Sequence, residues 1–142
     1  MKTNKDILAS VLKTTQMGQV GIRAVQDYVA RADLKKALQD QLGEYDAIER
    51  EASSIANSRG WELKDLDPMA KVMSRMYSRT NLKFGNVDSK VAAMMIQGNT
   101  RGMIKGLKNL HHAQNTDSRI ETVSQKLLDC EAANIKQMQG YL

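Results

Sequence analysis

The chain of 142 residues contains only one cysteine, one proline and six aromatic residues. A single cysteine cannot form an internal disulfide, which excludes a disulfide-stabilised scaffold and leads us to expect a reduced, cytoplasmic setting. The longest apolar run, residues 91–96, is too short to cross a membrane, and the N-terminus lacks the apolar stretch of a signal peptide. Because Ala, Leu, Lys, Gln, Met and Glu are abundant, the composition favours long helices over a sandwich or barrel.

Positive charge is concentrated in one part of the chain. The formal net charge is +5, yet residues 1–67 and residues 113–142 each carry −1. Residues 68–112 carry +7, because they contain eight Lys and Arg residues but only a single acid, Asp88. This excess predicts a basic surface that contacts a polyanion or a protein partner. The candidate contact residues are Lys71, Arg75, Arg79, Lys83, Lys90, Arg101, Lys105 and Lys108.

Apolar residues spaced by three and four predict two helices in the first half of the chain. The first is expected over residues 4–32. A very short link then leads to a second helix that Asp33 caps and Gly60 ends, with Trp61 folding back onto the helix end. Because the link is short, the two helices are predicted to form an antiparallel pair.

The second half predicts a broken segment and two further helices. Asp67 and Pro68 are typical of a helix start, and the stretch between Phe84 and Asp88 should interrupt that helix, with Asp88 capping the restart. The restarted helix is expected over residues 89–112. On one of its faces, Gly98, Gly102 and Gly106 are spaced by four, which predicts close packing against another backbone. The last helix is expected over residues 117–139.

These elements predict an all-α fold, an antiparallel four-helix bundle that forms one domain over residues 1–142. Polar residues at mid-height should form a buried layer that hydrogen-bonds to itself: Gln19, Gln41, Tyr45, Asn99 and Asn134. Cys130 falls on an apolar stripe and is expected to be a core residue, not a nucleophile. The chain contains no Glu-x-x-His motif, so neither a di-metal centre nor any other cofactor is expected. Glu44 and Glu131 are the two carboxylates that could face inward as an atypical metal site.

The layout resembles the ferritin-like superfamily and, within it, the bacterial proteins of the spore coat protein F type. The resemblance lies in the helical hairpin, the closing Ser58-Arg59-Gly60-Trp61, the linker ending in Pro68, and the Met- and Gly-rich residues 94–102. It covers most of the chain. It implies a helical bundle associated with the endospore coat or with sporulating cells, often without the ferritin metal ligands. The absence of Glu-x-x-His agrees with that group, and no catalytic residue follows from the resemblance.

We therefore expect a non-enzymatic structural or partner-binding bundle, located in the cytoplasm or in a spore coat. The basic residues are its candidate contact surface for a protein partner or for a second copy, as in a homodimer. The alternative explanation is a solvated face, partly paired with the acidic second helix of the same or a neighbouring subunit. Two other hypotheses stay open, namely a metal-binding or oxidative-stress protein and a nucleic-acid-associated protein. For the latter, Tyr77 and Phe84 offer few aromatic rings on which bases could stack.

Overall fold

The computed structural model describes residues 2–63, 82 and 85–142. They form four long helices, α1 (Asn4–Val25), α2 (Ala32–Ser58), α4 (Val87–His111) and α5 (Ser118–Gln139), and a short 3-10 helix η1 (Gln26–Tyr28). The predicted all-α class is confirmed for this part of the chain. None of the described helices combines the length and the apolar character that a membrane crossing requires.

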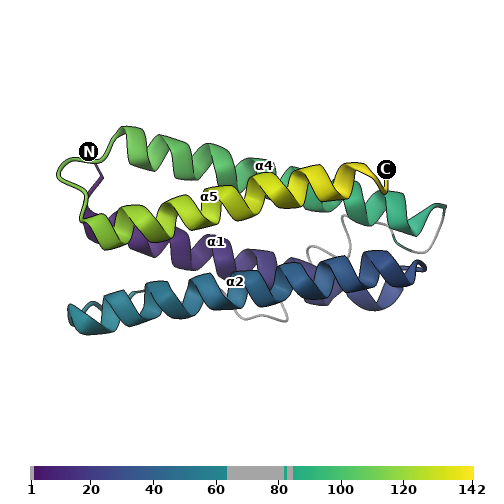
Figure 1. The fold of residues 1–142 in the computed structure, drawn as a ribbon, viewed down its shortest axis with the longest axis horizontal. Coiled ribbons are helices and arrows are strands. Elements are labelled where there is room, and N and C mark those ends of the chain that lie inside the picture. Colours follow the sequence, from purple (N-terminus) through teal and green to yellow (C-terminus); the bar gives the residue numbers. More distant parts are fainter. Residues whose placement is uncertain (1, 64–81, 83–84) are drawn as a thin grey trace.

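The four helices pack side by side around one apolar core (Figure 1). α1 packs against α2 and α4, while α5 packs against α2 and α4, so that α2 and α4 occupy opposite corners. Each helix runs antiparallel to its two neighbours, and α2 and α4 run in the same direction. Residues from the predicted stripes fill the core, among them Leu8, Val11, Ile22, Leu38, Ile48, Ile55, Val91, Ile120, Val123 and Met138.

The segment between α2 and α4 contains several of the predicted features. The expected helix start at Asp67 and Pro68 lies outside the described residues, as do four basic candidates, Lys71, Arg75, Arg79 and Lys83. On the far side of this segment, Gly85 has a φ of +82°, a conformation that favours glycine. Asn86 then caps α4 by accepting a hydrogen bond from the backbone N–H of Ser89.

The first helix is shorter than predicted. It ends at Val25 and not at residue 32, and η1 and the extended residue Val29 follow it. The apolar spacing continues through Val25 and Val29, and this continuation made the helix look longer. The chain must turn here to bring α2 back along α1, and the tighter 3-10 turn makes that change of direction.

Asp88 holds this turn from a distance, which corrects two of the predicted caps. Asp33 is not the cap of α2, because the helix begins at Ala32 with Arg31 at the cap position. Asp88 does not cap α4 either. Asp88 is 8% exposed, and its carboxylate accepts hydrogen bonds from the backbone N–H groups of Ala30, at 2.7 Å, and Arg31, at 3.1 Å. The start of α4 is therefore tied to the start of α2.

The end of α2 is as the sequence predicts. The helix stops at Ser58, and Gly60 adopts a φ of +66°. The backbone N–H of Trp61 donates to the carbonyl of Ala56 at 3.0 Å, and the Trp61 side chain packs partly buried against the core. The prediction that Trp61 folds back is confirmed.

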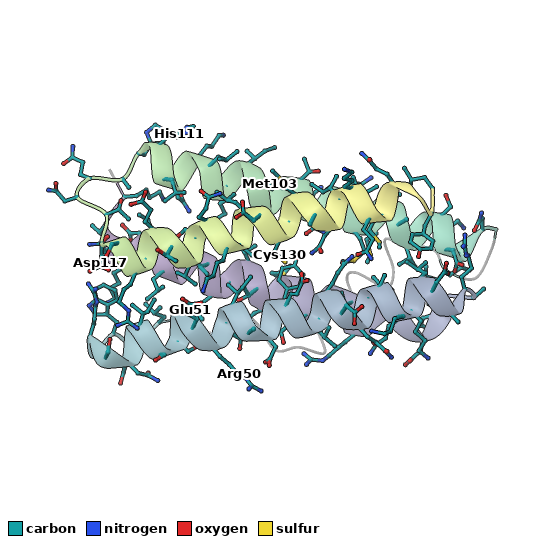
Figure 2. The ribbon with its side chains drawn as sticks, in the orientation of Figure 1. Arg50, Glu51, Met103, His111, Asp117 and Cys130 are labelled. Atoms are coloured by element: carbon teal, nitrogen blue, oxygen red, sulfur yellow. The ribbon has the colours of Figure 1, made fainter. Side chains whose placement is uncertain are left out.

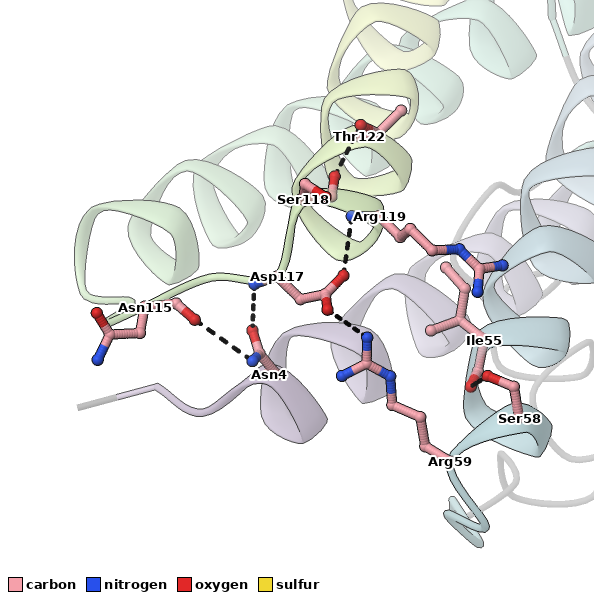
Figure 3. Close-up of polar contacts among 9 residues, drawn as sticks. All are labelled: Asn4, Ile55, Ser58, Arg59, Asn115, Asp117, Ser118, Arg119 and Thr122. Carbon is pink, nitrogen blue, oxygen red and sulfur yellow. Dashed lines mark hydrogen bonds and ion pairs between the residues drawn. The ribbon is translucent and has the colours of Figure 1, made fainter.

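At the same end of the bundle, Asp117 joins three helix termini (Figure 3). Its side chain caps α5 by accepting from the N–H of Arg119, and it also pairs with Arg59 just after α2. Its own N–H donates to the side chain of Asn4, in the first turn of α1, at 3.0 Å. The Arg59 guanidinium and the backbone donor hold the pKa of Asp117 below its usual value.

We predict that Asp88→Ala lowers the free energy of unfolding by about 1–3 kcal/mol, because it leaves two backbone N–H groups without an acceptor. Asp33→Ala is the matched control. Asp33 is exposed and pairs with Arg31 at 2.8 Å, so its loss should cost no more than about 0.5 kcal/mol. Urea denaturation of the two variants measures the difference, and equal losses would contradict the assignment of Asp88 as the residue that holds the turn.

Candidate functional site

The five predicted polar residues are all buried, but they do not form one layer. The Tyr45 hydroxyl donates to Asn99 Oδ1 at 2.6 Å, and Asn134 Nδ2 approaches the same oxygen at 3.4 Å. These three join α2, α4 and α5 at the centre of the bundle. Gln19 instead donates to Glu49 at 2.6 Å, and Gln41 donates to Gln137 at 2.9 Å.

Glu131 is the most unusual buried group in the described part of the chain. The residue is 1% exposed, and neither carboxylate oxygen has a hydrogen-bond partner in that part of the chain. Burial without a compensating charge raises the pKa of Glu131 to about 8. The carboxyl group is therefore mostly protonated at neutral pH.

Two glycines make room for side chains that cross the bundle. A Cβ atom built on Gly102 of α4 would lie 1.9 Å from Glu131 Oε2, and one built on Gly18 of α1 would lie 2.6 Å from the Tyr45 ring. The predicted close packing at Gly102 is therefore present, but the neighbour is a side chain and not a backbone. A Cβ atom built on Gly106 would likewise contact the Leu128 side chain. Gly98 is exposed, and a Cβ atom built there would have nothing within 4 Å.

A cavity of about 620 Å³ lies between α1 and α4, above these two glycines. Its buried lining includes Glu131, Tyr45 and Asn99. Around it are apolar and small residues, Met17, Gly21, Ala93, Met94 and Met95. Four cationic residues of the described chain also line it, of which Lys13, Arg101 and Lys105 are exposed and Lys90 is half-buried. The sequence indicated that Glu131 could face inward, but it did not predict this cavity, because the width of the cavity depends on how far apart two helices lie.

Cys130 lies midway along α5 (Figure 2). Its thiol donates to Glu44 Oε2 at 3.3 Å, and burial, reinforced by the Glu44 carboxylate, raises the pKa of Cys130 to about 12. A thiol that stays protonated at neutral pH is a poor nucleophile. Glu44 is exposed on α2, and the described residues contain no group of three His, Cys, Asp or Glu side chains that could hold a metal ion.

The described basic candidates give α4 a positive outer face. Arg101, Lys105 and Lys108 are exposed, and within the described ranges none of them has an ion-pair partner. Ile104 and Leu107 lie among them and are 51% and 41% exposed. The one acid of α4, Asp88, is turned inward, so nothing on this helix offsets its outer charge.

Comparison with known proteins adds no family to this picture: no family model matches the chain, and the search found no match among curated proteins or solved structures.

We predict that Glu131→Gln changes how stability depends on pH. The folded-state pKa lies above the unfolded value, so wild-type stability falls as the pH rises from about 5 to about 8, by an amount on the order of a few kcal/mol. The amide cannot ionise, so the variant should lack this loss. Thermal unfolding at about pH 5 and about pH 9 measures it, with the exposed Asp129→Asn as control. Parallel pH profiles for wild type and Glu131→Gln would show that Glu131 is not the group responsible.

We also predict opposite effects for two alanine substitutions in α4. Gly98→Ala should stabilise the protein by about 1 kcal/mol, because alanine favours a helix and the new methyl meets nothing. Gly102→Ala should destabilise it by about 1–3 kcal/mol, because the methyl displaces the Glu131 carboxyl group. Chemical denaturation checks both values. Adding Glu131→Ala to Gly102→Ala should recover part of the loss, and strictly additive effects would argue against the contact.

Proposed function

We propose that the protein is a non-enzymatic structural bundle that associates with further copies of itself. In this proposal the basic outer face of α4 docks on the acidic outer face of α2 of the next copy. The observation that carries the proposal is the opposite charge of two helices at opposite corners of the bundle (Figure 1).

The two faces are complementary in charge. α4 contains four Lys and Arg residues and the single, inward-turned acid Asp88. α2 contains six acids and three basic residues, and Asp40 and Glu44 lie exposed one turn apart. Charges of opposite sign steer two surfaces together and fix their register, while Ile104 and Leu107 add apolar area to the α4 side.

The position of the two faces determines the kind of assembly. A symmetric dimer through α4 would bring Arg101, Lys105 and Lys108 against their own copies, which like-charge repulsion disfavours. A contact between α4 of one copy and α2 of the next joins different surfaces. Such a contact repeats from copy to copy and builds rings or open chains.

This role agrees with what the resemblance to spore coat protein F implies. The parallel, diagonal placement of α2 and α4, joined by one long connection, supports the ferritin-like connectivity proposed from the sequence. The protonated thiol of Cys130 supports a protein without nucleophilic catalysis. We place the assembled protein in the cytoplasm or in a spore coat.

We predict that the weight-average mass in sedimentation rises with protein concentration at low salt and falls at high salt, where exposed charges are screened. Lys105→Glu combined with Lys108→Glu should leave the protein monomeric, because two acidic faces then oppose each other. Asp40→Lys combined with Glu44→Lys should do the same with two basic faces. Mixing the two variants should restore association, since each reversed face then meets an opposite charge.

The matched control is Lys5→Glu combined with Lys136→Glu, an equal change of charge at exposed positions outside both faces. It should associate as the wild type does. If the mixture of reversed variants stays monomeric, the proposed contact is wrong. Salt-sensitive binding to a nucleic acid by the wild type, without any self-association, would favour the nucleic-acid hypothesis, although the described helix α4 contains no Phe, Tyr or Trp side chain for stacking.

A further inference from the structure

The cavity between α1 and α4 ends on a carboxyl group that no described residue binds. Its volume of about 620 Å³ falls within the range of about 300–1,000 Å³ that is usual for small-molecule sites. Glu131 lines it, with both oxygens buried and unpartnered. A buried polar group without a partner costs about 1–3 kcal/mol, so the structure holds this one at an energetic disadvantage.

The neighbouring donors are already used within the protein. The Tyr45 hydroxyl donates to Asn99, and the Asn99 amide donates to the carbonyl of Met95 at 2.7 Å. Among the described residues no cation lowers the pKa of Glu131, and burial raises it. An ammonium group would supply what is missing at the floor, because it brings several N–H donors and a positive charge.

The outer part of the cavity favours a negatively charged group, in contrast to the floor at Glu131. Lys13, Arg101 and Lys105 are exposed there, and Glu131 is the one acid among the described residues of the lining. A ligand carrying only an amine would be repelled by these cations. An acidic group at its other end would be attracted by them.

Between floor and rim the walls are apolar and adaptable. Met17 and Met94 line the cavity from α1 and α4, and methionine side chains adjust to ligands of different shape. Gly18 and Gly21 leave space along the α1 side of the cavity, because they have no side chain. An unbranched apolar spacer would fill this part.

We propose that this cavity binds a small zwitterion with an amine at one end, an acidic group at the other and an apolar spacer between them. The amine lies against Glu131, and the acidic group lies at the rim with Arg101 and Lys105. The rim of this cavity shares Arg101 and Lys105 with the proposed docking face of α4, whereas Glu131 lies inside the bundle, away from both docking faces. A change at Glu131 therefore tests the cavity separately from the self-association.

Binding moves one proton. In the free protein at neutral pH the Glu131 carboxyl group is protonated. The ammonium group of the ligand favours the ionised carboxylate, so that carboxyl loses its proton to solvent while the ligand keeps its own. No covalent bond forms or breaks other than this O–H bond.

The test is isothermal titration calorimetry with three probes of equal chain length, namely aminohexanoate with its amine at the chain end, hexanoate and hexylamine. The longer aminooctanoate is the fourth probe. We expect an aminoalkanoate to bind most tightly and to release about one proton at neutral pH, measured in buffers of different ionisation enthalpy. Glu131→Gln should weaken that binding at least about tenfold and abolish the proton release. It should leave the affinity for hexanoate unchanged.

Two controls separate the ends of the site. Glu121→Gln removes an exposed carboxylate from the same helix and should change nothing. Arg101→Ala should weaken the aminoalkanoate and hexanoate but not hexylamine. Absence of binding by both aminoalkanoates at millimolar concentration would overturn the proposal, and so would unchanged affinity in Glu131→Gln. Glu131→Gln should still self-associate in sedimentation. The cavity and the docking contact are therefore tested separately.

Discussion

The centre of this bundle depends on the fit of two large polar side chains over two glycines. Tyr45 crosses from α2 to Gly18, and Glu131 crosses from α5 to Gly102. A β-carbon at either glycine would force the crossing side chain to shift. Because both side chains reach the α1 and α4 side of the bundle, the floor between those helices is polar and the space above it stays open. The same contacts thus determine packing, protonation and the cavity.

Charged groups are accommodated differently inside the bundle and on its surface. Inside, Glu131 has no cation beside it among the described residues, and it avoids the cost of a buried charge by remaining protonated. Outside, α4 carries cations without acids, because its one carboxylate serves the turn before α2. The use of Asp88 as a structural acceptor is therefore also the reason that the outer face of α4 is so positive.

The helices themselves were predictable because each turns one apolar stripe to a single core. Ile48, Val123 and their neighbours recur at spacings that leave little choice. The helix ends were less predictable, since Asp88 binds Ala30 and Arg31 from far along the chain and a local pattern favours Asp33. The glycine spacing in α4 correctly indicated close packing at Gly102, but sequence alone could not tell that Glu131 is what packs there.

The cluster around Asp117 has a dynamic consequence. Helix ends normally fray one by one, because each loses only its own last hydrogen bonds. Here the first turn of α1, the residue after α2 and the cap of α5 share one carboxylate and its backbone. Opening any of them exposes the other two, so this end of the bundle should exchange its amide hydrogens as a single cooperative unit.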